Sequence, residues 1–314
     1  MIVSNYAFVF PGQGSQSIGM LADLAQAHSA IKETFDQCSE ALGYDLWALC
    51  QDGPEDRLNM TEYTQPALLA AGVAVWRSWQ QAGGGQPSVM AGHSLGEYTA
   101  LVCAGAMSLV DAVKLVALRG QLMQKAVPAG HGAMAAILGL EGQALTDVCD
   151  AAAQGQVVSP ANLNAPGQVV IAGDADAVAR AIAMATEAGA KRAIPLAVSA
   201  PSHCDLMLPA AQSLAEKLVE IELSVPNIAV VQNADAAVME NAEQIRDALK
   251  RQLYQPVRWT ECVQNMASMG ADTLVECGPG KVLTGLARRI DRSLKAVAIG
   301  EPAGFDALMG ECNG

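Results

Sequence analysis

The chain has 314 residues, a hydrophobic content of 51%, an aromatic content of only 4% and a formal net charge of -13. This length is enough for one large domain or for a main domain with a smaller one, and the abundant Ala and Gly favour closely packed α/β layers over an all-β sandwich. The negative charge argues against nucleic acid and membrane surfaces as partners, because both would repel the chain.

The sequence predicts no membrane segment, no signal peptide and no disulfide framework. The longest apolar run, 66–76, is shorter than the roughly 18 residues that would indicate a membrane span. The start MIVSNYAFVF lacks the basic residues and cleavage pattern of a signal peptide and is typical of a first β-strand. The eight cysteines contain no CxxC pair and are widely scattered, so most are expected to be small buried side chains. We therefore expect a cytoplasmic protein.

Short apolar strands alternate with helical patterns along the first part of the chain, and Gly and Pro mark the turns. The predicted elements are, in order, a strand at 6–10, a glycine-rich turn at 11–16, a helix at 20–42, a helix at 64–85 with Pro66 near its first turn, an apolar strand leading to Gly92, a helix from Leu95 and a helix capped by Ser108. This order is typical of an α/β fold.

A compact alternation of strands and helices follows from about Gly130. Its order is βαββαβ, which is that of the ferredoxin-like unit, an antiparallel sheet with two helices on one side. Longer elements then return, including a helix at 204–221 and a strand at 273–279. We predict that 128–197 form an inserted subdomain, and that 1–127 and 198–314 together form a discontinuous main domain.

Gly92, Ser94 and Gly96 form a GxSxG pattern between an apolar strand and a helix. The glycines allow the strand and the helix to approach closely, and the serine is then exposed at the tip of the turn. The backbone N–H of Leu95 would lie at the helix start, where unbonded N–H groups and the helix dipole favour negative charge. The pattern predicts a nucleophile with an oxyanion site, and a purely structural turn is the alternative.

A serine nucleophile needs a base, and the chain has four histidines. His28 lies in an Ala-rich, surface-like helix and His131 in a connection flanked by glycines, so neither is expected to act on the serine. His93 is next to Ser94 along the tight turn, where its side chain should point away from that of the serine and support the turn. His203 lies just before a helix, whose N-terminus would keep the imidazole neutral and basic. We expect His203 to be the base, and a structural histidine is the alternative.

Arg119 lies on the apolar face of the helix that follows Ser108. An unpaired cation in such a place is costly, so the guanidinium must meet a carboxylate. That carboxylate belongs either to the protein itself or to the substrate, which the guanidinium would then bind in bidentate geometry.

With these residues taken together, the chain resembles the malonyl-CoA:acyl carrier protein transacylase family. Members of this family load malonyl groups in dissociated, bacterial-type fatty acid synthesis. The resemblance covers nearly the whole chain. It rests on seven stretches that occur in the family's order and spacing: FPGQGSQ, GHSLGEY, ALRGQLMQ, ANLNAPGQVVIAG, SAPSHC, QLYQPVRWT and ECGPGKVLTGL.

The resemblance implies a role for each matching residue. Ser94 would be acylated, His203 would act as general base and acid, and Arg119 would bind the free carboxylate of the malonyl group. The N–H groups of Gln13 and Leu95 would form the oxyanion hole.

Two further positions and the fold follow from the same resemblance. The main-chain carbonyl of Gln252 would orient the histidine in place of a triad acid, and Asn162 would border the cleft. The implied fold is an α/β-hydrolase-like core with a parallel sheet, carrying the ferredoxin-like subdomain. The only CoA compound required is the thioester substrate itself, no metal or other cofactor is expected, and the chain is expected to be a monomer.

The implied reaction is a ping-pong transfer of malonyl from malonyl-CoA to the phosphopantetheine thiol of acyl carrier protein. The motifs leave open a transacylase for a polyketide or other specialised carrier protein, and also methylmalonyl as substrate. A serine esterase or thioesterase and a non-catalytic binding scaffold are the alternatives from other classes. Because carrier proteins are typically acidic, the basic stretches 288–295 and 191–192 are candidate docking surfaces, with a solvated helix face as the alternative.

Overall fold

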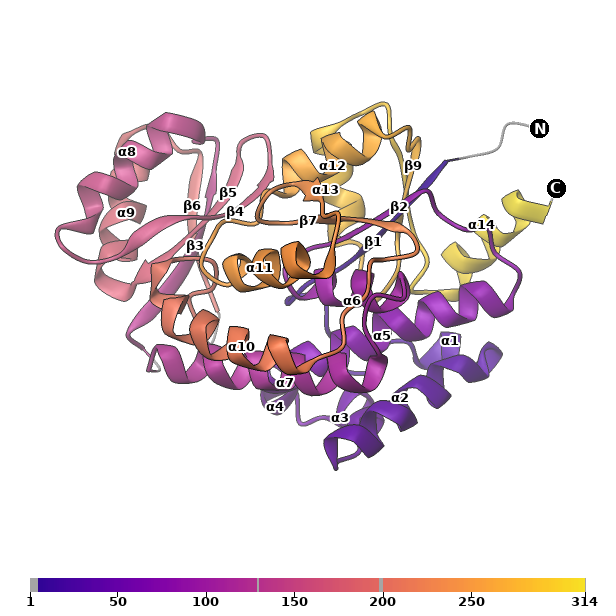
Figure 1. Cartoon of the computed structure of the whole chain (residues 1–314). Helices are drawn as coiled ribbons and strands as arrows, with labels where there is room; N and C mark the ends of the chain where they lie inside the picture. The colour runs from indigo at the N-terminus through magenta and orange to yellow at the C-terminus, as the bar shows by residue number, and fades with distance from the viewer. Residues whose placement is uncertain (1–4, 129, 198–199, 314) are drawn as a thin grey trace.

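The computed structural model describes residues 5–128, 130–197 and 200–313, and it contains two separate sheets within them (Figure 1). The larger sheet has the strand order β10-β9-β1-β2-β7-β8 and is parallel except for β8, which pairs antiparallel with β7. Its strands are β1 (Tyr6–Phe10), β2 (Val89–Gly92), β7 (Ala229–Gln232), β8 (Ala237–Val238), β9 (Thr273–Glu276) and β10 (Lys295–Ala298). The sequence prediction of an α/β fold with a parallel sheet is confirmed.

The central strands of this sheet are covered on both faces, as expected for parallel strands that are apolar throughout. Phe8 and Phe10 of β1 belong to one hydrophobic cluster, whereas Ala7 and Val9 belong to a second one. Since successive side chains of a strand point to opposite faces, the two clusters lie on the two sides of the sheet.

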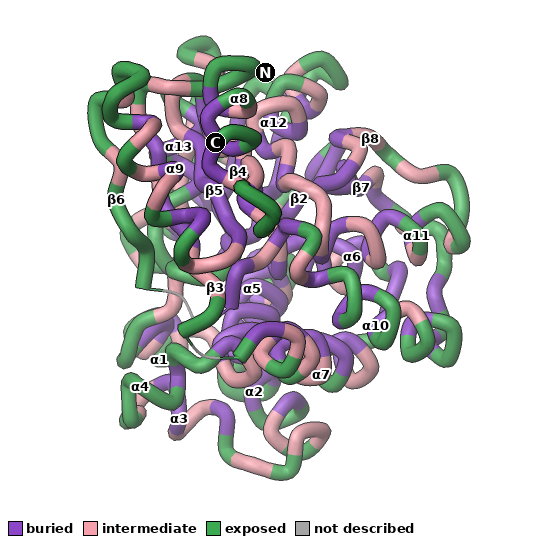
Figure 2. Tube along the Cα trace, turned by 90° about the vertical axis from the view of Figure 1, so that its left-hand side faces the viewer, coloured by how far each residue is buried: buried purple, intermediate pink, exposed green. Residues whose placement is uncertain are grey.

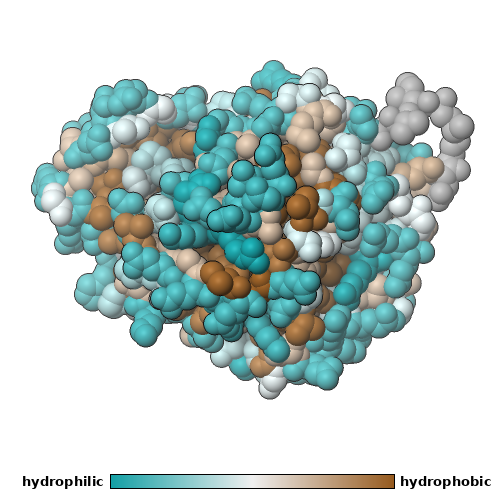
Figure 3. Space-filling model, in the orientation of Figure 1, coloured by the Kyte–Doolittle hydropathy of each residue, from teal (hydrophilic) through white to brown (hydrophobic). Residues whose placement is uncertain are grey.

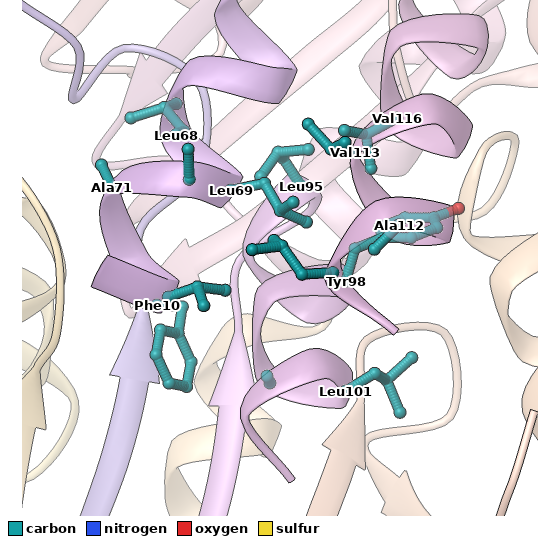
Figure 4. Packing of buried hydrophobic residues seen from close by; sticks show 14 of the residues in the cluster. Phe10, Leu68, Leu69, Ala71, Leu95, Tyr98, Leu101, Ala112, Val113 and Val116 are labelled. Carbon is teal, nitrogen blue, oxygen red and sulfur yellow. The ribbon is translucent and has the colours of Figure 1, made fainter. Parts of the chain in front are cut away.

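Helices on both faces complete the clusters, and Figure 4 shows part of the larger one, where side chains of α5, α6 and α7 meet. The helices associated with the large sheet are α1 (Ala22–Ala27), α2 (Ser29–Leu42), α3 (Leu46–Asp52), α4 (Glu55–Leu58), α5 (Thr61–Gln81), α6 (Leu95–Cys103), α7 (Leu109–Ala126), the short 3-10 helix η1 (Asp205–Met207), α10 (Leu208–Glu220), α11 (Ala242–Gln252), α12 (Trp259–Ser268), α13 (Val282–Ile290) and α14 (Pro302–Asn313).

The second sheet has the order β4-β5-β3-β6, and each of its strand pairs is antiparallel. The predicted order βαββαβ is confirmed: β3 (Gly132–Leu138), α8 (Gly142–Ala153), β4 (Val158–Ala165), β5 (Gln168–Asp174), α9 (Ala175–Glu187) and β6 (Arg192–Leu196). Ala135 and Ile137 of β3 pack with α8 and α9, while Met134 packs with Cys204, beyond the second sheet. This unit therefore presents one sheet face to its own helices and the other to the rest of the chain.

Three predicted helices differ from the structure. The one at 204–221 forms the 3-10 helix η1 and then α10, which begins at Leu208. The pattern at 20–42 forms two helices, because His28 has an extended backbone between α1 and α2 and its ring packs against Phe305. Helix α5 begins at Thr61, so that Pro66 lies inside the helix and not near its start. The predicted cap is confirmed, since the Ser108 side chain accepts a hydrogen bond from the N–H of Asp111. The predicted boundary at 198 falls outside the described residues.

Burial follows the layers of the fold. In Figure 2 the buried trace runs through β2, β5 and α5, and the exposed segments lie mostly at the periphery. The face shown in Figure 3 is mostly hydrophilic, with hydrophobic side chains in separate groups. Among the described helices, none combines the length and the apolar character that crossing a bilayer requires.

Candidate active site

Ser94 occupies the turn between β2 and α6, where its backbone has φ 51° and ψ -106°. Such a conformation is strained for a residue with a side chain, at a cost on the order of 1–3 kcal/mol. The strand and the helix approach each other so closely that a Cβ on Gly96 would lie 2.0 Å from the carbonyl oxygen of Phe10. A Cβ on Gly92 would lie 1.8 Å from the backbone of Gly96. Both flanking glycines are therefore required by space.

His203 contacts the serine directly, although 109 positions separate the two residues in the sequence. The distance from Ser94 Oγ to His203 Nε2 is 2.8 Å, and His203 Nδ1 lies 2.6 Å from the main-chain oxygen of Gln252. Since a carbonyl oxygen only accepts, Nδ1 carries the proton and Nε2 is free to accept the serine proton. The backbone N–H of His203 also donates to the carbonyl of Leu253, which fixes the residue to the end of α11.

The protein environment keeps His203 neutral. Its side chain is buried, and this burial lowers the pKa of His203 from 6.5 to about 3, with the nearby Arg119 cation contributing in the same direction. A neutral imidazole is the form that accepts a proton, so the site holds the base in its active state over the whole physiological pH range.

Arg119 lies on α7 and is 1% exposed, yet its hydrogen bonds go to neutral groups. Nη1 donates to Gln65 Oε1 at 2.8 Å, and Nη2 donates to Gln252 Oε1 at 3.0 Å and to Ser94 Oγ at 3.3 Å. Within the described residues, Nε has no hydrogen-bond partner and no carboxylate forms an ion pair with this guanidinium. Glu97 is the buried carboxylate that interacts electrostatically with Arg119, but it lies beyond ion-pair distance and leaves the guanidinium without a direct carboxylate contact in this part of the chain.

A cleft of about 230 Å³ opens over these residues, between the turns of the large sheet and the face of the antiparallel sheet. Ser94, His203 and Arg119 line it together with Gln13 and Leu95. Leu95 is the first residue of α6, so its N–H belongs to the unbonded end of the helix. From the antiparallel sheet the lining residues are Met134, Asn162, Asn164, Gln168, Val170 and Leu196. Gln252 does not line the cleft but supports His203 and Arg119 from behind.

Sequence reasoning missed two residues that link Arg119 to the first turn of the chain. Gln65 Nε2 donates to Thr61 Oγ1 at 2.9 Å, and Thr61 Oγ1 donates to Gln13 Oε1 at 2.9 Å. Gln65 is also the group that accepts from Arg119 Nη1. The only signal in the sequence was the polar start of an otherwise apolar helix at 61–65.

Sequence reasoning also missed Glu97 and Asn233. The backbone N–H of Asn233 donates to Glu97 Oε2 at 2.6 Å, while the Asn233 side chain bonds to the backbone of Gly92 and Ser94. Burial raises the pKa of Glu97 to about 7. The available signal was a polar pair, Gln232 and Asn233, at the end of an apolar strand on the same sheet edge as the serine.

The other histidines lie apart from the proton-transfer pair. His93 Nε2 lies 2.8 Å from Asn164 Oδ1, and its ring packs near Trp259, so it connects the serine turn with β4 and α12. His28 and His131 do not line the cleft. The eight cysteines are free, and six of them are buried.

Comparison with known proteins gives consistent matches over nearly the full length. The family model described as acyl transferase domain matches residues 7–303. Malonyl CoA-acyl carrier protein transacylase of Escherichia coli strain K12 is 57% identical over 307 residues, covering 98% of this chain and 99% of that protein.

Solved structures agree with these matches. The crystal structure of an acyl carrier protein S-malonyltransferase from Vibrio cholerae has 61% identity and a TM-score of 0.95, covering 97% of this chain and all of the other. A malonyl-transacylase in complex with its type II PKS acyl-carrier protein has 56% identity and a TM-score of 0.97, covering 98% of this chain and all of the other. With a matching domain model and relatives above 50% identity over almost every residue, the chain belongs to the malonyl CoA-acyl carrier protein transacylase family of acyltransferases.

Proposed function

We propose that the protein transfers the malonyl group from malonyl-CoA to the phosphopantetheine thiol of acyl carrier protein through a malonyl ester on Ser94. One observation carries this proposal: a serine hydroxyl lies 2.8 Å from a neutral imidazole and 3.3 Å from a buried guanidinium that forms no ion pair among the described residues. The family membership supports the same reaction.

In the first half-reaction, His203 Nε2 takes the proton of the Ser94 hydroxyl while Oγ attacks the thioester carbon of malonyl-CoA. The carbonyl oxygen becomes an oxyanion, which the backbone N–H groups of Gln13 and Leu95 stabilise. When this intermediate collapses, the C–S bond breaks and the CoA sulfur leaves with the proton held by His203. The product is the malonyl ester of Ser94.

The second half-reaction runs through the same groups in reverse. The phosphopantetheine thiol gives its proton to His203, and the resulting thiolate attacks the ester carbon. Collapse of the second oxyanion breaks the C–O bond, and Ser94 Oγ leaves with the proton from His203. The carrier protein departs as a malonyl thioester.

Arg119 selects the acyl group by its charge. A guanidinium that is desolvated without a carboxylate partner gains an ion pair when the malonyl carboxylate enters. An acetyl group brings no such partner, so the buried cation stays unpaired and the transition state for acetyl transfer is less stable.

Two further residues support this assignment. The Gln252 carbonyl fixes the His203 tautomer, and the Gln252 side chain holds Arg119 beside the serine. Asn162 borders the acyl pocket from β4. No metal or redox cofactor is required in this scheme, because an acyl thioester is already activated and the developing charge is met by backbone donors.

We also propose the setting of this reaction. Residues 1–127 and 198–314 form an α/β-hydrolase-like catalytic core, and 128–197 form a ferredoxin-like subdomain that closes the cleft from one side. The protein acts in the cytoplasm, which agrees with its eight free cysteines. The monomeric state stays a prediction.

The carrier protein docks on the basic surface of α13 in this proposal. Arg288 and Arg289 are exposed at the end of that helix, and Arg289 Nη1 donates to Gln168 Oε1 at 2.6 Å. Gln168 itself lines the cleft, so an acidic partner bound here would bring its thiol to the entrance. Lys191 and Arg192 form a second exposed basic stretch.

A carrier protein of polyketide synthesis is the second candidate for the acceptor. It is favoured by the match at 56% identity to a malonyl-transacylase in complex with a type II PKS acyl-carrier protein. The residues around Ser94 serve either acceptor equally, because the thiol is the same and only the protein that carries it differs.

Intact-mass analysis tests the proposed function. The protein is mixed with malonyl-CoA and then with holo carrier protein, in parallel with Ser94→Ala. A malonyl adduct on the parent alone, which moves to the carrier protein on mixing, is the expected result. Release of the adduct to water without transfer would indicate a serine esterase or thioesterase, and a parent that forms no adduct would exclude catalysis by Ser94.

A further inference from the structure

Two side-chain amides hold the backbone of Ser94 itself. The N–H of Ser94 donates to Asn233 Oδ1 at 2.7 Å, and the carbonyl oxygen of Ser94 accepts from Gln252 Nε2 at 2.9 Å. Asn233 Nδ2 also donates to the carbonyl oxygen of Gly92 at 2.7 Å. One asparagine therefore bridges the last residue of β2 and the serine, across the turn that carries the reacting hydroxyl.

This bridge acts where the chain would otherwise relax. The positive φ of Ser94 is unfavourable for a residue with a Cβ, so the turn stays in this shape only if its surroundings determine it. A rotation of the turn would move Oγ away from His203 Nε2, which now lies 2.8 Å away. A displacement of about 1 Å at a reacting atom can reduce a rate roughly 100-fold.

Asn233 is itself rigidly placed. It is fully buried and follows β7, which pairs in parallel with β2. Its own N–H donates to Glu97 Oε2 at 2.6 Å, and its carbonyl accepts from the N–H of Arg258 at 3.1 Å. The asparagine backbone is thus fixed by α6 on one side and by the start of α12 on the other, and its side chain is held by its own bonds to Ser94 and Gly92.

We infer that Asn233 is a positioning residue for acylation, which holds the Ser94 turn in the geometry that proton transfer to His203 requires. The inference rests on the proposed function and assigns this residue to the chemical step and not to recognition of the malonyl carboxylate. The reason is that none of the hydrogen bonds of Arg119 involves Asn233. Apart from its bond to Ser94, Asn233 reaches a partner of Arg119 through the long bond of 3.5 Å that Gln252 Nε2 donates to Asn233 Oδ1.

The test uses two variants and a matched control in the full-length protein. Asn233→Ala removes the bridge, and Asn233→Asp keeps the size of the side chain but removes the donor to Gly92. Gln232→Ala removes the neighbouring buried amide, for which no hydrogen-bond partner is found among the described residues. Single-turnover acylation by malonyl-CoA is followed by rapid quench and intact mass, and thermal unfolding is measured for every variant.

Both Asn233 variants are expected to lower the maximal acylation rate by roughly 10- to 100-fold, while the malonyl-CoA concentration at half-maximal rate changes by less than about threefold. Gln232→Ala is expected to acylate at the parent's rate even where it unfolds at a lower temperature. A lower acylation rate in folded Asn233 variants, with the parent's rate in Gln232→Ala, supports positioning. A purely structural role would instead lower the stability of all three variants alike, without a loss of rate confined to Asn233.

Several outcomes would overturn the inference. The first is that folded Asn233 variants acylate at the parent's rate. The second is that these variants change only the malonyl-CoA concentration at half-maximal rate. The third is that Gln232→Ala loses as much acylation rate as the Asn233 variants. Should neither Asn233 variant fold, amide hydrogen exchange of Ser94 in the parent decides: protection supports the bridge, and exchange at the rate of an unbonded amide contradicts it. A parent that forms no Ser94 adduct would instead refute the proposed function.

Discussion

Arg119 Nη2 lies 3.3 Å from Ser94 Oγ, so a buried cation stands directly beside the hydroxyl that is proposed to carry the acyl group. This placement has two consequences. The guanidinium can bind a carboxylate at the far end of a three-carbon acyl group on the serine, and its charge also helps to lower the pKa of His203. Substrate selection and the neutral state of the base therefore depend on the same side chain.

Replacing Arg119 by alanine is expected to reduce malonyl loading and to relax the preference for malonyl over acetyl. The variant loses the ion pair to the malonyl carboxylate, so kcat/KM for malonyl-CoA should fall by roughly 30-fold or more, which corresponds to about 2 kcal/mol. Acetyl-CoA should lose much less. The measurement is the ratio of the two kcat/KM values in the parent and the variant.

Arg77→Ala is the matched control for this experiment. Arg77 also donates from a helix to a hydroxyl and an amide oxygen, those of Thr34 and Gln37, but it does not line the cleft. It should leave the malonyl to acetyl ratio unchanged. An unchanged ratio in Arg119→Ala as well would remove Arg119 from substrate selection.

The pH dependence of acylation should reflect the lowered pKa of His203. Because the folded protein protonates this imidazole only near pH 3 and not near 6.5, the base stays neutral as the pH falls through 6.5. We expect kcat/KM for malonyl-CoA to show no acid limb near pH 6.5 and to fall only toward the lowered pKa. Initial rates from pH 8 to pH 4 provide the measurement.

The same shift predicts a loss of stability in acid. Below pH 6.5 the unfolded chain protonates this histidine while the folded protein does not, so the free energy of unfolding decreases as the pH falls from 6.5 toward about 3. The Glu97 carboxyl group acts in the opposite direction, because its raised pKa gives stability below 4.5 that is lost as the pH rises through about 7. Glu97→Gln removes the titration of this carboxyl group, so the pH dependence that remains can be assigned to His203. If the acylation rate of Glu97→Gln still changed near pH 6.5, the pKa of His203 would not be lowered as described.

Gly96→Ala should prevent the serine turn from forming. The added Cβ would lie 2.0 Å from the carbonyl oxygen of Phe10, so β1 and α6 must separate. We expect the free energy of unfolding to fall by about 3 kcal/mol and acylation to be lost. Denaturant unfolding of this variant is compared with Gly285→Ala on α13, where nothing lies within 4 Å of the added Cβ.

Gly285→Ala should instead gain about 0.5–1 kcal/mol, because alanine reduces the freedom of the unfolded chain at a helical position. If the two variants unfolded alike, close packing at the serine turn would not be the reason for Gly96.

Reversing the charge of Arg288 and Arg289 should weaken docking of the carrier protein. The double change to glutamate places negative charge next to an acidic partner, so the apparent KM for the carrier protein should rise several-fold while malonyl exchange with free CoA stays constant. Kinetics of both reactions are measured at low and high salt. The same change at Lys191 and Arg192 tests the second basic stretch, and unchanged carrier kinetics in the first variant would discard the α13 surface.

Much of the fold was predictable because its signals are local. Apolar strands, glycine at the turns and helical spacing depend on neighbours within a few positions, and they correctly predicted β1, the turn at Ser94, the Ser108 cap and the order βαββαβ. The helix break at His28 was not predictable in this way, since the ring contact with Phe305 joins distant parts of the chain.

The sequence by itself determined the chemistry that is available: a serine between two glycines that space requires, one histidine suited to be its base, and an arginine on an apolar helix face. Only the tertiary structure decided how these groups are held. Asn233 and Gln252 bond to Ser94, which is 139 and 158 positions away from them. Gln65 bonds to Arg119, which is 54 positions away. Such amides are ordinary polar residues in a sequence, and their role emerges only when the packing of β2, β7, α5 and α11 brings their bonding partners within about 3 Å.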